Sequence, residues 1–156
     1  MPSPPPALLE LHWLLALFVV FWTGLSALLA MLAGWPRLAT RFRSDQMVAG
    51  ETFRFASGAM GASIWLPVSY RCNLFYTVAD SGLHLSVLFL FRLMSPPLFI
   101  PWEQVASITE ERIWLINTAV IRLRGTSIMI MVRGRAAHAV KTAYGRYSSR
   151  KSTHNP

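Results

Sequence analysis

Cysteine and charge are both scarce in this sequence. Cys72 is its one cysteine, and charged residues make up 14% of the chain. A lone cysteine excludes an internal disulfide and agrees with a reducing compartment. Soluble proteins carry about a quarter charged residues, so the deficit, together with 53% hydrophobic residues, argues against an ordinary soluble protein. The composition therefore indicates contact with lipid.

The deficit is greatest from Leu11 to Pro36, where no charged residue occurs. We predict a transmembrane helix from Leu11 to Ala33, within a membrane segment 11–35 that follows a flexible N-terminus, 1–10. Such a helix is about 35 Å long, and the hydrocarbon core is about 30 Å thick. A signal peptide is the alternative, but its basic residues precede the apolar core, whereas here they follow it.

The bases that follow this segment predict its orientation. Arg37, Arg41 and Arg43 come directly after it, and Glu10 is the only charged residue before it. Because positive residues stay in the cytoplasm, we expect the N-terminus outside and the C-terminal domain inside. The three arginines are expected to fix this topology and to contact lipid headgroups, each adding about 1 kcal/mol of attraction to an anionic membrane. Residues 36–50 are expected to form a juxtamembrane linker.

Small residues recur every four positions in the predicted helix, at Ser26, Ala30 and Gly34. This spacing lets two membrane helices approach closely. A homodimer through this face is therefore one expected partnership, beside the bilayer and an unknown protein partner.

The rest of the chain favours short strands, because β-branched and alternating runs are separated by turn residues. Turns are indicated at Asp80-Ser81-Gly82 and at Arg124-Gly125-Thr126. Helical spacing of alanines predicts one C-terminal helix over 134–147, and a polar tail, 148–156, is expected to be disordered. The predicted strands are 52–57, 63–68, 74–79, 82–91, 98–100, 105–110, 118–124 and 127–132.

A second apolar run, Leu83 to Trp102, tests this interpretation. As a membrane helix it would carry Arg92 near its middle, at a cost of about 2.5 to 3.5 kcal/mol. Pro96 and Pro97 would also break the helical hydrogen-bond ladder. We therefore predict two strands joined by a proline turn, and contact between the apolar hairpin 83–99 and the bilayer stays open.

Three segments carry a resemblance to a known family. They are Asp80-Ser-Gly-Leu-His-Leu85, Met94-Ser-Pro-Pro-Leu-Phe-Ile-Pro-Trp102 and Glu103-Gln-Val-Ala-Ser-Ile108. The chain resembles uncharacterised bacterial single-pass membrane proteins with a pleckstrin-homology-like (PH-like) domain. The resemblance implies an α+β, mainly β fold: after the transmembrane helix, a bent antiparallel sheet or barrel over 51–147 with a C-terminal helix. It also implies the bacterial inner membrane, and it carries no catalytic residues.

No constellation for chemistry is visible. None of His12, His84, His138 and His154 has a second ligand at metal-binding spacing. No nucleophile elbow or phosphate-binding loop occurs. We therefore expect no enzymatic activity, no cofactor and no metal site.

Basic residues are the one positive signal in the C-terminal third. Nucleic-acid binding would require interleaved exposed aromatics or a groove-reading helix, and neither is evident, so we expect no nucleic acid. We expect instead a non-enzymatic binding or scaffolding domain at the cytoplasmic face that contacts a partner protein or anionic lipid. The alternative is an accessory subunit of a membrane complex, held by its helix. The candidate anionic-partner surface comprises Arg122, Arg124, Arg133, Arg135 and Lys141.

Overall fold

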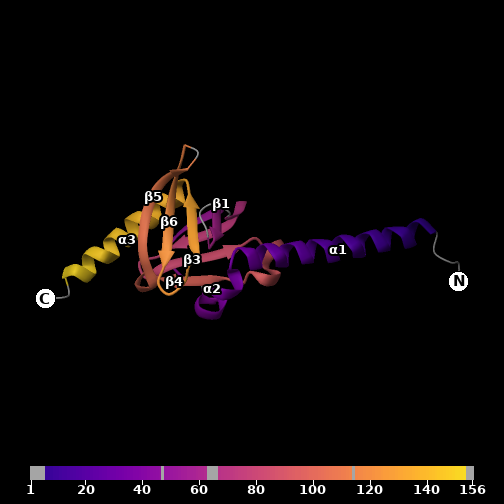
Figure 1. Cartoon of the computed structure of the whole chain (residues 1–156), viewed down its shortest axis with the longest axis horizontal. Helices are drawn as coiled ribbons and strands as arrows, with labels where there is room; N and C mark the ends of the chain where they lie inside the picture. The colour runs from indigo at the N-terminus through magenta and orange to yellow at the C-terminus, as the bar shows by residue number, and fades with distance from the viewer. Residues whose placement is uncertain (1–5, 47, 63–66, 114, 154–156) are drawn as a thin grey trace.

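The computed structural model describes residues 6–46, 48–62, 67–113 and 115–153. A long N-terminal helix is followed by a curled antiparallel half-barrel and a C-terminal helix. The α+β fold predicted from the sequence is therefore confirmed. The N-terminal part of the first helix and the end of the last helix lie at opposite ends of the elongated molecule (Figure 1).

Helix α1, Pro6–Leu32, contains the predicted apolar segment. Its N-terminal part protrudes from the rest of the molecule (Figure 1), and side chains such as Leu14, Phe18 and Val20 are exposed all round the helix. Because exposed apolar surface on this scale is unfavourable in water, α1 requires an apolar environment.

A sharp turn at Gly34 joins α1 to a second helix, α2, Trp35–Phe42. Gly34 has a φ of 78°, a left-handed conformation that glycine adopts without steric cost. Pro36 occupies the first turn of α2, where a missing N–H costs nothing. The linker predicted for 36–50 is therefore wrong at 36–42: Trp35, Leu38 and Phe42 are buried, and their burial against the sheet stabilises a helix there.

The sheet has the strand order β4-β3-β2-β1-β7-β6-β5, with every pair antiparallel. Its edges are β4 and β5, which are also consecutive in the chain. The half-barrel is thus left open between these two strands. The strands of the described chain are β1 Glu51–Gly61, β2 Val68–Val78, β3 Gly82–Val87, β4 Leu98–Pro101, β5 Val105–Ile113, β6 Ile116–Leu123 and β7 Met129–Arg133.

Irregular pairing of β1 with β2 contributes to the curl of the sheet. The register shifts between Phe53 and Ala56 and again between Ala56 and Gly58. Phe55 and Cys72 both have a φ of 54°, the backbone signature of residues forced out of an ordinary strand. Such bulges bend a strand and increase its twist.

The hydrophobic core lies inside the curl and is closed by α2 and the C-terminal helix α3, Arg135–Thr153. Two indoles are fixed by hydrogen bonds to backbone carbonyls. Trp35 Nε1 donates to Pro96 O at 2.8 Å, and Trp102 Nε1 donates to Ala79 O at 3.0 Å. These bonds satisfy the polar atoms of the two largest buried side chains.

Two predicted strands differ from the structure or fall outside the described residues. The strand expected over 82–91 ends at Val87 and is followed by a 3₁₀ helix, η1, Phe89–Met94. The strand expected over 63–68 lies outside the described residues except at its end, where β2 begins at Val68. A further short helix, η2, Trp102–Gln104, connects the two edge strands.

Helix α3 extends to Thr153, so the disordered tail predicted for 148–156 is wrong at 148–153. The hydroxyls of Ser149, Ser152 and Thr153 donate to carbonyls four residues earlier, which satisfies polar groups that were expected to favour a tail. Tyr147 also packs against the core and holds the helix beyond its predicted end.

Candidate functional site

The predicted membrane segment corresponds to Glu10–Leu32, which is long and apolar enough to cross a membrane. A signal sequence near an N-terminus satisfies the same criteria. The structure adds that the end of this helix is packed: Ala30 and Ala33 are buried in the domain core.

The small-residue stripe of α1 faces its own domain. Ser26 and Ala30 are 7% and 2% exposed, and Gly34 lies directly under Ile128, which precedes β7. The close approach that these residues permit is thus used within the chain. A homodimer stays an untested prediction, but this stripe is already covered.

The three juxtamembrane arginines have different surroundings. The Arg37 side chain is exposed, and among the described residues it has no hydrogen bond or ion pair. The backbone of Arg43 bridges to Leu98 on the β4 edge. The Arg41 guanidinium donates through Nη1 to Arg124 O at 2.9 Å and through Nη2 to Gln104 Oε1. Arg41 therefore ties α2 to the sheet, a structural role that its sequence position did not reveal.

The five predicted bases of the C-terminal third do not form one patch. Arg122 and Arg124 project from the end of β6, whereas Arg133 pairs with Thr118 at the start of that strand. Four residues along a strand separate these two places by about 13 Å. Lys141 Nζ forms an exposed ion pair with Glu110 Oε2 at 2.7 Å, so a carboxylate already lies beside its charge.

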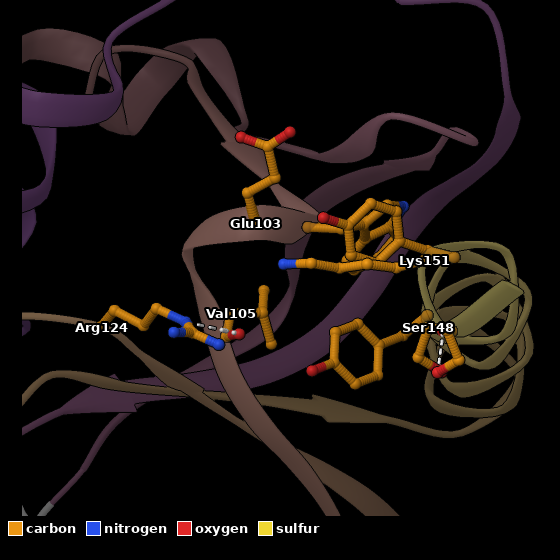
Figure 2. A pocket seen from close by; sticks show the side chains of 9 residues that line it. Glu103, Val105, Arg124, Ser148 and Lys151 are labelled. Atoms are coloured by element: carbon orange, nitrogen blue, oxygen red, sulfur yellow. Dashed lines mark hydrogen bonds between the residues drawn. The ribbon is translucent and has the colours of Figure 1, made fainter. Parts of the chain in front are cut away.

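A basic residue outside the predicted set, Lys151, lies near Arg124. Lys151, in the last turns of α3, lies with Arg124 on a cleft of about 580 Å³ between η2, β5 and α3. Figure 2 shows the Lys151 side chain extending across the cleft from α3, with Arg124 on the opposite wall. The cleft is lined by Trp102, Glu103, Val105, Arg124, Tyr144, Tyr147, Ser148, Lys151 and Ser152.

Aromatic rings form the floor of this cleft. The rings of Trp102 and Tyr144 meet edge to face, with centroids 6.0 Å apart, and Tyr144 and Tyr147 lie 6.3 Å apart. Arg124 is held beside them because its Nε donates to Val105 O at 3.4 Å. With two bases and one acid, Glu103, the cleft carries a net positive charge above an aromatic floor. Such a surface suits an acidic group attached to an apolar or planar one.

The sequence missed this cleft, although part of its signal was present. Tyr144, Tyr147 and Lys151 are spaced three and four residues apart, so they share one face of a helix. The polar residues after Tyr147 favour a tail, which obscures this spacing. Glu103 and Trp102 come from a distant segment and are brought in only by the fold.

A second cleft, of about 650 Å³, is lined by Glu51, Phe53, Arg135, His138, Ala139, Thr142 and Arg146. Burial lowers the pKa of His84, and the nearby charge of Arg92 lowers it further. Within the described residues, no group of three His, Cys, Asp or Glu side chains is placed to hold a metal ion. Cys72 is exposed, with its Sγ 3.9 Å from Ser57 Oγ.

Comparisons with known proteins do not assign the chain to a family. No protein-family model matches the sequence, and no curated protein matches it either. The functional argument therefore depends on the geometry alone.

Proposed function

We propose that this chain is a single-pass protein of the bacterial inner membrane whose PH-like domain is a non-enzymatic binding module at the cytoplasmic face. One observation carries the proposal: α1 protrudes from one end of the molecule and the end of α3 lies at the other (Figure 1), and residues of α3 line the basic aromatic cleft. An anchor at one end and a binding surface at the other is the arrangement of a tethered adaptor.

The packing of α1 supports a retained anchor over a removable signal sequence. Cleavage after the apolar segment would remove Ala30 and Ala33 from the core, where each is at most 2% exposed. It would also leave the buried face of α2 without its neighbour. A domain that depends on the end of its first helix is stable only while that helix stays attached.

Charge supports the cytoplasmic orientation. Arg37, Arg41 and Arg43 all follow α1 directly and are exposed on α2 or at its end. Their positions agree with the preference of positive residues for the cytoplasmic side.

The chemistry of the cleft favours an acidic segment of a partner protein as its ligand. Arg124 and Lys151 supply positive charge, and the rings of Tyr144 and Tyr147 supply apolar contact beside it. Headgroups of the same bilayer lie toward α1, away from this cleft. A soluble partner approaching from the cytoplasm reaches the cleft directly.

Site-specific photo-crosslinking in intact membranes tests the proposal. A benzophenone amino acid replaces Tyr147 in the full chain, and the matched control carries it at Thr142, an exposed position elsewhere on α3. We expect a protein adduct at 147 that disappears at high salt and in the double variant Arg124→Gln/Lys151→Gln. The double variant Arg112→Gln/Arg150→Gln changes the net charge equally outside the cleft and should keep the adduct.

Other outcomes would redirect the assignment. Equal adducts at 147 and 142, or adducts indifferent to Arg124 and Lys151, would refute a specific cleft. Adducts only from probes on the lipid-facing side of α1 would favour the accessory-subunit alternative, because exposed positions such as Leu17 would then contact another membrane protein.

A further inference from the structure

The 3₁₀ helix η1, between β3 and β4, presents apolar side chains to the outside. Phe89 is 72% exposed and Met94 is 39% exposed. Removing a phenylalanine side chain from water is favourable, so a soluble domain gains little by displaying one. The exposure of Phe89 and Met94 indicates that an apolar partner covers this surface.

This exposed surface is continuous with that of α1. The ring of Phe91 in η1 lies against the ring of Trp22, with centroids 5.2 Å apart. Helix α1 and η1 contact each other, and Ser26, about one turn further along α1, is buried. Figure 1 shows the segment between β3 and β4 lying beside α1 where the helix leaves the domain.

The position of Trp22 along α1 fixes the depth of this contact. Trp22 is the twelfth residue after Glu10, so the part of the span beyond the contact is about 18 Å long. The hydrocarbon core is about 30 Å thick. If η1 stayed in water, the part of α1 left to lipid would be too short to cross. Crossing therefore requires the turns of α1 that follow Trp22, Thr23 to Leu32, and the contact of Trp22 with η1 then lies within the hydrocarbon.

We propose that η1 is immersed in the cytoplasmic leaflet beside α1, with Phe89 in contact with lipid acyl chains. The inference rests on the membrane anchor proposed above and names a second membrane-contacting element. The protein then meets the bilayer through two elements distant in sequence: a spanning helix and a wedge that enters one leaflet.

The backbone of η1 suits such an environment. In lipid, every peptide group needs a partner within the protein. Phe91 N donates to Leu88 O at 2.9 Å, Ser95 N donates to Arg92 O at 3.1 Å, and Leu88 N donates to Asn73 O at 2.9 Å. The 3₁₀ turn and its connection to β2 thus satisfy groups that an open loop would leave exposed.

Arg92 is compatible with this position because an arginine can extend its charge toward the headgroups. Its charge acts on His84, whose surroundings also include Ser44 and Asp45, in the segment after α2. Arg92 is itself exposed, so its side chain can extend beside the lipid toward headgroup phosphates and water.

Depth-dependent fluorescence quenching tests the wedge. In a Cys72→Ser background, a single environment-sensitive dye is attached to Phe89→Cys in the full chain. The protein is reconstituted in phosphatidylcholine–phosphatidylglycerol vesicles with nitroxide-labelled acyl chains. Leu17→Cys reports on the span, and Thr142→Cys reports on the cytoplasmic side. All three side chains are exposed, so labelling leaves the core intact.

We expect the dye at 89 to lose fluorescence to acyl-chain nitroxides as strongly as the dye at 17, while the dye at 142 is unaffected. Quenching at 17 with none at 89 would refute the wedge and leave the anchor standing. No quenching at 17 would refute the anchor, and the wedge with it. Quenching at 142 would refute the placement of η1 as the element nearest to lipid.

Discussion

Ile128 lies directly over Gly34: a Cβ added to this glycine would be 2.6 Å from Ile128 Cδ1. Gly34 is also the residue at which α1 turns into α2, with a φ of 78°. The absence of a side chain therefore allows two things at once, the left-handed turn and the seating of α1 on the core.

Replacement of Gly34 with alanine should destabilise the protein by about 1 to 3 kcal/mol. The left-handed conformation costs an L-residue about 1 to 2 kcal/mol, and the contact with Ile128 requires that side chain to move. The measurement is chemical unfolding of the full chain in detergent, followed by the fluorescence of the buried tryptophans.

Gly145→Ala is the matched control. Gly145 lies inside α3, and nothing lies within 4 Å of an added Cβ. Alanine favours a helix over glycine by about 1 kcal/mol, so this variant should gain stability. Equal effects of the two alanines would contradict a special role for Gly34.

Arg41→Lys should lower the free energy of unfolding by about 1 kcal/mol without altering membrane topology. Lysine keeps the charge that sets orientation, but it cannot reproduce the two-branched donation to Arg124 O and Gln104 Oε1. Arg37→Lys, at an exposed side chain, should leave stability unchanged. Unfolding measurements check the loss of stability, and a reporter fused to the C-terminus checks that the membrane topology is unchanged. A topology change in Arg41→Lys would contradict the structural role.

Alkaline pH should destabilise the domain through two buried phenols. Burial raises the pKa of Tyr70 to about 12 and also raises the pKa of Tyr76, against a smaller opposing effect from Arg133. Above the ordinary pKa of 10.0, the unfolded state loses these protons while the folded state keeps them. Stability is therefore fully present below that pH and falls above it, by at most about 1.4 kcal/mol per pH unit for each tyrosine.

Unfolding measured from neutral to alkaline pH checks this expectation against Tyr70→Phe/Tyr76→Phe. Both hydroxyls are buried without a hydrogen-bond partner among the described residues. Their removal should therefore cost little at neutral pH and should flatten the alkaline loss. Parallel pH curves for the two proteins would show that other groups dominate.

Leu115→Gly should stabilise the β5–β6 hairpin by a few tenths to 1 kcal/mol. Leu115 has a φ of 65° and is 85% exposed, so the side chain contributes backbone strain and little packing. Glycine removes the strain, although its greater freedom in the unfolded chain offsets part of the gain. Thermal unfolding measures the net effect, and Leu115→Ala, which keeps a Cβ, is the control that should gain less.

The sequence predicted the elements whose pattern is long or strongly periodic. The uncharged run in α1 has one physical solution in lipid, a helix, and the alternation in Ile121-Arg122-Leu123-Arg124 matches the buried and exposed faces of β6. Arg92 and the Pro96-Pro97 pair correctly indicated the absence of a second long helix in that run, where the structure forms η1 and β4.

Two helical segments were missed for different reasons. In α2, the spacing of Trp35, Leu38 and Phe42 with Pro36 in the first turn is a helix signal, but the arginines drew the interpretation toward a linker. The last turns of α3 are held by contacts of Tyr147 with the core and by hydroxyls of their own. The polarity of the local sequence cannot reveal that Tyr147 contacts the core.

The candidate cleft depends on pairings that no local pattern contains. Arg124 reaches it from the end of β6 and Lys151 from α3, twenty-seven positions later in the chain. Conversely, Arg133 and Lys141 were grouped with Arg124 by closeness in sequence, and the sheet separates them. The sequence of a segment shows how many basic residues it contains, whereas the register of the strands determines which of them lie close together.

The firm seating of α1 on the core has a consequence for reach. A flexible tether lets a domain sample a hemisphere above its membrane, which lowers the effective concentration of its binding surface at any one height. Here Gly34 and the buried Trp35 leave no slack between anchor and domain. The proposed wedge would also restrict tilting. If the chain is the membrane-tethered binding module proposed above, its cleft is held at a set height above the bilayer, and it meets only partners whose acidic segment reaches that height.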